Sequence, residues 1–96
     1  MRLLYHPSAA QEISDAAVLY ESKAVGLGTA FLEQVDAAAE KLLRDPQRWP
    51  VIEHDIRRIM LKRFPFGIYF RIADDTVRVL TLKHHRQHPG YGMQRR

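Results

Sequence analysis

The hydrophobic pattern of this chain changes its period once, near residue 50, and this change is the strongest constraint on its fold. Between residues 9 and 44 apolar side chains recur every three or four positions, as on the buried face of an amphipathic helix. From residue 56 to 82 branched and aromatic residues dominate, which is typical of strands. A chain of 96 residues has room for one core. The pattern therefore predicts a single α+β domain with helices packed on one sheet.

Two helices are predicted, separated by the turn Gly26-Leu27-Gly28. Ser8 is expected to cap the first helix, with Gln11 completing a capping box. In that helix Glu12 falls on the polar, solvent-facing side. The second helix is expected to end at Asp45-Pro46 because the residue before a proline avoids helical geometry. An antiparallel helix hairpin is the expected result.

A short strand at residues 2–6 precedes the helices, and three antiparallel strands at 56–64, 67–72 and 76–82 follow them. Residues 47–55 are expected to form an irregular connection in which Trp49 closes one end of the core. The predicted order is thus β-α-α-β-β-β in one domain spanning residues 1–91. Residues 92–96 are expected to bury nothing and to form a mobile tail.

Charge is divided unevenly along the chain, whose net charge is +4. Residues 1–45 hold four basic and seven acidic side chains, a balance of −3, whereas residues 46–96 hold eleven basic and four acidic ones, a balance of +7. A positive field of that size attracts phosphate groups or an acidic protein segment.

Several classes of protein are disfavoured by what the sequence lacks. There is no cysteine, and hence no disulfide framework or thiolate metal site. No apolar run approaches the roughly 20 residues that span a bilayer, so we expect no membrane association and a cytoplasmic location. Gly26 and Gly28 lack the lysine and the preceding strand of a phosphate loop. No cofactor is expected.

The segment "LKHHRQHPGY" at residues 82–91 is the densest cluster of reactive side chains. A metal site is disfavoured because His84 and His85 are expected to point to opposite faces of a strand, and Pro89 opposes the helix that would unite His84 with His88. Metal-free RNA cleavage would need a proton acceptor, an acid and a cation for the phosphorane charge. His84, His85, Arg86 and Tyr91 have the chemistry to fill these roles.

Basic residues also recur along the first of the three later strands. Alternation places Arg57, Ile59, Leu61 and Arg63 on one face and Arg58, Met60 and Lys62 on the other. Such cations either bind a phosphate or an acidic partner, or lie along a partly exposed strand and discourage aggregation.

The order of elements, with "RFPFGIYFR" at 63–71 and "HHRQHPGY" at 84–91, resembles the RelE/ParE superfamily of bacterial toxins. The resemblance spans nearly the whole chain. It implies the toxin of a type II toxin–antitoxin module that inhibits growth, stabilises plasmids and forms a hetero-oligomer with a cognate antitoxin. It also implies that the target and the antitoxin bind basic and aromatic residues: Arg57, Arg58, Lys62, Arg63, Arg71, Arg86 and Tyr91.

Two branches of the superfamily act differently. ParE-like members poison DNA gyrase without being enzymes, and the motifs of this sequence resemble theirs more closely. RelE-like members cut messenger RNA on the ribosome, and here the catalytic set would be Arg63, Lys83, His85, Arg86 and Tyr91. The chain has Gly67 where RelE-like members commonly carry an arginine. A third interpretation is a member that binds its partner but no longer harms the cell.

Overall fold

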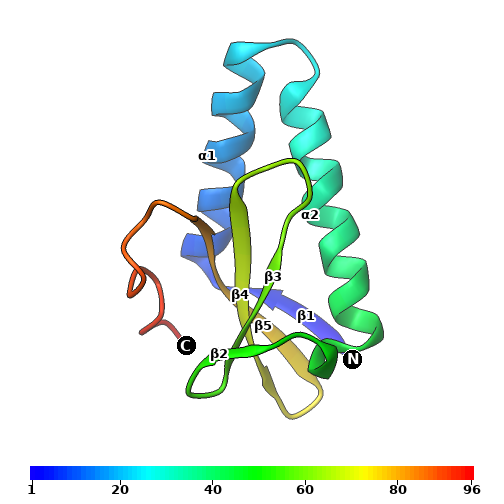
Figure 1. Ribbon diagram of the computed structural model, residues 1–96. Helices are drawn as coiled ribbons and strands as arrows, with labels where there is room; N and C mark the ends of the chain where they lie inside the picture. The colour runs from blue at the N-terminus through cyan, green and yellow to red at the C-terminus, as the bar shows by residue number, and fades with distance from the viewer.

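Two antiparallel helices cover one face of a five-stranded sheet in the computed structural model, which describes residues 1–96 (Figure 1). The elements in chain order are β1 (Arg2–Tyr5), α1 (Pro7–Lys23), α2 (Leu27–Arg44), a 3₁₀ turn (Pro46–Arg48), β2 (Val51–Glu53), β3 (Ile56–Met60), β4 (Phe66–Ala73) and β5 (Thr76–His84). The predicted α+β class, the helix hairpin and the three later strands are confirmed.

The sheet has the order β1-β5-β4-β3-β2. Only β1 and β5 run parallel, with Arg2 opposite Thr76, and all other neighbours are antiparallel. In the β4–β5 ladder Tyr69 pairs with Thr81 and Phe70 pairs with Val79, so Leu80 has no partner and β5 bulges there. The bulge resets the alternation of β5, so that Leu80 and Lys83 face one side of the sheet and Val79 and Leu82 the other.

The main core lies between the helices and the sheet. Its fully buried side chains include Phe31 and Leu42 of α2 and Ile68 and Phe70 of β4. At one end the rings of Tyr20, Phe31, Phe64 and Phe66 pack against one another, mostly edge to face. A second, smaller cluster of Ile56, Tyr69, Leu80 and Met93 lies on the opposite face of the sheet. The face that the helices leave open is therefore partly covered by the end of the chain.

The cap of α1 differs from the sequence expectation. His6 is the N-cap, and its Nδ1 accepts a hydrogen bond of 3.0 Å from the backbone N–H of Ser8. Pro7 starts the helix because its fixed φ suits the first helical position and its missing N–H needs no partner there. Gln11 donates to Asp15 instead of closing a capping box. The prediction that Ser8 is the cap is wrong.

The connection between the helices and β3 also differs from the expectation. It contains the short strand β2, which pairs with β3 across an irregular turn in which His54 has a φ of 52°. Trp49 packs against the edge of the core, as predicted. The first long strand ends at Met60 rather than residue 64, because Arg63 adopts a φ of 70° and Pro65 follows.

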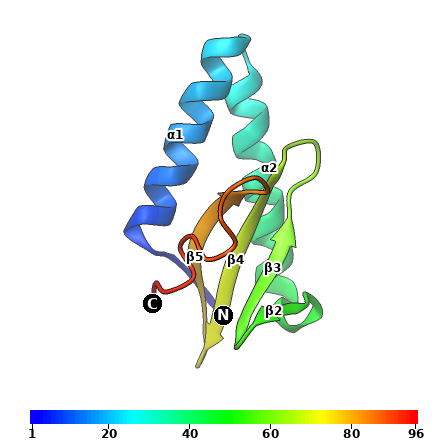
Figure 2. The same ribbon diagram turned by 60° about the vertical axis from the view of Figure 1, so that its left-hand side comes forward.

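The segment after β5 folds back over that strand (Figure 2). Met93 is buried against the small cluster with 9% of its surface exposed, and a Cβ on Gly92 would lie 2.6 Å from the Thr81 side chain. The expectation that residues 92–96 bury nothing is therefore wrong, because β5 offers them an apolar surface. Their mobility stays a prediction.

Candidate functional site

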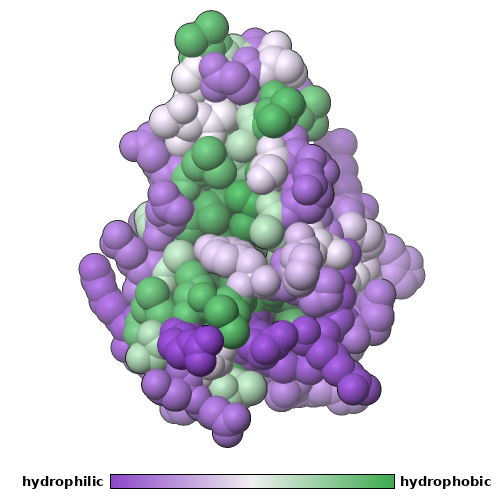
Figure 3. Space-filling view, turned by 180° about the vertical axis from the view of Figure 1, so that it is seen from behind, coloured by the Kyte–Doolittle hydropathy of each residue, from purple (hydrophilic) through white to green (hydrophobic).

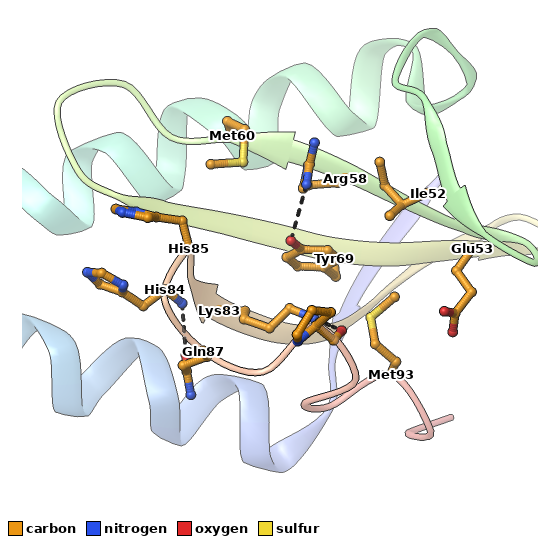
Figure 4. A pocket seen from close by; sticks show the side chains of 11 residues that line it. Ile52, Glu53, Arg58, Met60, Tyr69, Lys83, His84, His85, Gln87 and Met93 are labelled. Atoms are coloured by element: carbon orange, nitrogen blue, oxygen red, sulfur yellow. Dashed lines mark hydrogen bonds between the residues drawn. The ribbon is translucent and has the colours of Figure 1, made fainter.

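The open face of the sheet carries a pocket with a volume of about 240 Å³ (Figure 4). Strands β2 to β5 and the segment after β5 supply its lining. Tyr69 of β4 lies between two cations, Arg58 of β3 and Lys83 of β5, because each of these residues sits at the outward-facing position of its strand. The pocket is therefore basic with an aromatic centre.

Lys83 is buried although it is charged. Only 3% of its surface is exposed, its Nζ lies 4.2 Å from the centre of the Tyr69 ring, and it donates a 2.5 Å hydrogen bond to the carbonyl of Pro89. Burial lowers the pKa of Lys83, Glu53 opposes this shift, and Arg58 adds to it. The ring and the carbonyl stabilise the ammonium only in part, since neither carries a full negative charge.

Arg58 contacts the same tyrosine, with its Nη1 donating to the Tyr69 hydroxyl over 3.4 Å. Neither Arg58 nor Lys83 forms a salt bridge. The three salt bridges of the chain join Met1 to Asp75, Arg71 to Asp55, and Arg95 to Glu12. Two cations thus share one pocket without a paired carboxylate.

Two histidines lie at the rim of this pocket. The rings of His84 and His85 stack with centroids 4.6 Å apart, so the expectation that they point to opposite faces is wrong. The reason is that β5 ends at His84 and the chain turns there, held by the Arg86 N–H donating to His84 Nδ1. Burial, His85 and Arg86 together lower the pKa of His84. No three His, Asp or Glu side chains are grouped closely enough to hold a metal ion.

A second polar cluster is centred on Glu12 of α1. Its carboxylate accepts hydrogen bonds from Thr81 Oγ1 at 2.9 Å, the Leu82 N–H at 3.2 Å, the Tyr91 hydroxyl at 2.5 Å and Arg95 Nη1 at 3.0 Å. Burial by itself raises the pKa of Glu12, but the hydrogen bonds from Arg95, Tyr91 and Thr81 outweigh it and lower that pKa. Glu12 thereby ties the end of the chain to α1 and β5, and its predicted position on the solvent-facing side is wrong.

Of the residues predicted to bind or catalyse, Arg58, Lys83 and His85 line the pocket. The others lie elsewhere. Arg57 faces the opposite side of the sheet and donates hydrogen bonds to the carbonyls of Gln47 and Trp49, and Arg71 forms a salt bridge of 3.3 Å with Asp55. Lys62 and Arg63 are exposed on the β3–β4 loop, and Arg86 is exposed in the turn after β5. The Tyr91 hydroxyl donates a hydrogen bond to Glu12. Of the five residues of the RelE-like catalytic set, Lys83 and His85 line the pocket.

Tyr69, Met60 and Met93 line the pocket but were not among the predicted site residues. Period-2 alternation already placed Met60 beside Arg58 on one face of β3, and this was the available signal. Tyr69 follows the same rule on β4. Met93 reaches the pocket only through tertiary packing of the chain's end, for which the sequence carries no local signal.

The helix side of the molecule has a different character (Figure 3). Apolar patches there include a shallow groove of about 230 Å³ between the helices, lined by Ile13, Leu32 and Val35 and bordered by Tyr5 and Asp36. The helices approach closely at Gly28, where a Cβ would lie 2.5 Å from the carbonyl oxygen of Ala17. Neither helix has the length and apolarity required to cross a bilayer.

Comparison with known proteins identifies the class of protein. A family model described as "ParE toxin of type II toxin-antitoxin system, parDE" matches residues 3–89. The chain therefore belongs to the ParE toxin family, and the resemblance to the RelE/ParE superfamily is confirmed. A solved chain described as "Chromosomal ParDE TA system from P. aeruginosa" has a TM-score of 0.75, covers 88% of this chain and 95% of its own length, and is 18% identical. That likeness shows the same fold. No curated protein sequence gives a significant match.

Proposed function

We propose that this chain is a ParE-like toxin that arrests growth by inhibiting DNA gyrase in the cytoplasm, and that a cognate antitoxin neutralises it in a hetero-oligomer. The observation that carries the proposal is the match of residues 3–89 to the ParE toxin family. Family membership gives the toxin class, and we infer gyrase as the target from the ParE-like motifs of the sequence.

A binding role is also supported by the distribution of reactive groups. The hydroxyl of Tyr91 is held by Glu12, whereas Lys83 and His85 line the pocket on the open face of the sheet. A nuclease would need its acid, base and phosphate-binding groups around one reacting phosphate. The exposed loop cations Lys62 and Arg63 and the turn residue Arg86 are better placed to contact a large partner.

The charge division suggests what kind of antitoxin would bind. Residues 46–96 carry a balance of +7 and form most of the open face of the sheet. An acidic antitoxin segment would be steered toward this half of the molecule by its field. Apolar contacts, to the helix groove or to the pocket walls, would then slow its dissociation.

The proposal is tested with purified toxin, gyrase and relaxed plasmid. We expect toxin to block supercoiling and to accumulate cleaved DNA, and we expect the protein encoded by the adjacent gene to restore supercoiling. Relaxation of the supercoiled form of the same plasmid by a topoisomerase I, which the toxin should leave unchanged, is the control. Unimpaired supercoiling at excess toxin, with a preparation that is folded and arrests growth when expressed, would refute the gyrase target.

A RelE-like ribonuclease is the second candidate, favoured by one observation, namely that Lys83 and His85 line a common basic pocket. If it is correct, the toxin cleaves messenger RNA in a ribosome-dependent way, and a double Arg86→Ala, Tyr91→Ala variant loses that cleavage. Primer extension on a translated message measures it. Growth arrest that survives the folded double variant would rule this candidate out.

A further inference from the structure

We propose that the pocket on the open face of the sheet is an anchor for one carboxylate side chain of an acidic, apolar-flanked peptide segment, bound by Arg58 and Lys83. The proposal rests on the proposed function, because the antitoxin is the partner that would supply such a segment. It adds to that function the chemistry of the contact and the residues that make it.

The first argument is the unbalanced charge of the pocket. The ammonium of Lys83 has three donors, of which one is bonded to the carbonyl of Pro89, and 97% of the residue's surface is withdrawn from solvent. A buried cation that forms no salt bridge is costly, Arg58 adds a second positive charge nearby, and the attraction of Glu53 offsets this only in part. A carboxylate entering the pocket would neutralise these cations and accept hydrogen bonds from them.

The second argument is that the required geometry already exists. The Nζ of Lys83 is fixed over the Tyr69 ring at 4.2 Å, and the guanidinium of Arg58 is held at the hydroxyl of the same tyrosine. Both cations are thus positioned before any ligand arrives. A ligand that binds to such a site loses less free energy to ordering side chains.

The third argument concerns which anion fits. Ile52, Met60 and Met93 supply apolar walls beside the cations, and the carboxylate of Glu53 also lines the pocket (Figure 4). Arg58, Lys83 and Glu53 leave the pocket with one net positive charge, which one carboxylate balances, whereas the successive phosphates of a nucleic acid favour a broad basic surface. A single carboxylate on a chain whose neighbouring residues are apolar matches both the charges and the walls. The pocket therefore favours a peptide over a nucleic acid.

The probe is a blocked leucine–glutamate–leucine tripeptide at millimolar concentrations, followed by NMR on isotope-labelled toxin. We expect signals of Met60, Tyr69, Lys83 and Met93 to shift on titration. The matched leucine–glutamine–leucine tripeptide should bind at least about tenfold more weakly, because it lacks the charge that strengthens hydrogen bonds to cations.

Variants of the toxin assign the contact. Lys83→Met keeps the buried hydrocarbon stem and Arg58→Gln keeps polarity, and each should weaken tripeptide binding by about tenfold or more. Arg78→Gln removes a cation from the same strand as Lys83 but outside the pocket, and should leave binding unchanged. Circular dichroism of each variant establishes that it is folded.

Three results would overturn the proposal: no pocket shifts with the glutamate tripeptide, equal binding of the glutamine tripeptide, or tighter binding of a single-stranded oligodeoxynucleotide to the same residues. The last would make the pocket a nucleic-acid site. A toxin that inhibits gyrase yet fails the peptide test would refute the anchor alone. A toxin that binds the peptide and leaves gyrase active would refute the gyrase target alone.

Discussion

Replacing Glu12 by glutamine tests how the end of the chain is held on the domain. The change removes one negative charge and keeps the side-chain volume. In the wild type the carboxylate accepts four hydrogen bonds and pairs with Arg95, and the two side chains are 17% and 15% exposed. In the variant Arg95 loses its counterion, and an amide N–H replaces one of the accepting oxygens.

The expected loss of stability follows from these contacts. Breaking a buried charged pair by removing one partner costs about 3–5 kcal/mol. Glutamine retains one oxygen that can still accept from Thr81 and Leu82, and the pair is partly exposed, so we expect about 2 kcal/mol. For a domain of this size that lowers Tm by roughly 8–16 °C. Thermal unfolding followed by circular dichroism measures it.

Acidic pH should remove the difference in Tm between the wild type and Glu12→Gln. The pKa of Glu12 is lower in the folded chain than in the unfolded one. The contribution of Glu12 to folding stability is therefore complete above the ordinary glutamate pKa, and it is lost as the pH falls through the lower pKa that Glu12 has in the folded chain. Asp15→Asn is the matched control, because Asp15 lies on the same helix, forms no salt bridge and has one exposed side-chain hydrogen bond, from Gln11. Equal Tm values for Glu12→Gln and Asp15→Asn at neutral pH would refute the reasoning.

Three further predictions follow from the packing. Gly28→Ala places a methyl group 2.5 Å from the Ala17 carbonyl oxygen and should cost about 1–3 kcal/mol in denaturant unfolding, whereas exposed Thr29→Ala should cost less than about 0.5 kcal/mol. Phe31→Ala removes a fully buried ring from the centre of the aromatic group and should lower the free energy of unfolding by about 3–5 kcal/mol in the same measurement. A smaller loss than for Gly28→Ala would mean that Phe31 is not central to the core. Amide hydrogen exchange measures the mobility expected of residues 92–96 and tests whether Glu12 restrains it. The Met93 N–H donates to the Gly90 carbonyl, and in Glu12→Gln it should exchange faster than in the wild type. Unchanged exchange would mean that Glu12 does not hold this segment.

Most of the architecture was predictable because it depends on local patterns. Apolar residues such as Ile13 and Val35 recur at helical spacing and are buried as predicted, and the branched runs became β3, β4 and β5. The strand β2 was missed because its three exposed residues are too few to show an alternating pattern. The cap at His6 was missed because a histidine at that position carries a weaker statistical signal than a serine.

The candidate site was less predictable because its parts come from distant segments. Alternation placed Arg58 on the same face of its strand as Met60, and in the structure both line the pocket. Lys83 reaches that face only because β5 bulges at Leu80. Glu12 looked like an ordinary solvent-facing helix residue, and its partners Thr81, Tyr91 and Arg95 are 69 or more residues away in sequence. Such contacts leave no periodic trace, so only the folded chain reveals them.

The parallel pairing of β1 with β5 has a consequence for synthesis of the toxin. Arg2 pairs with Thr76 and Tyr5 with Val79, so β1 has no strand to pair with until β5 has been translated. Closing so long a loop is entropically costly and slows folding. A nascent toxin on the ribosome therefore lacks a complete sheet until β5 has emerged from the exit tunnel, and a partner that needs the assembled sheet can engage it only after that moment.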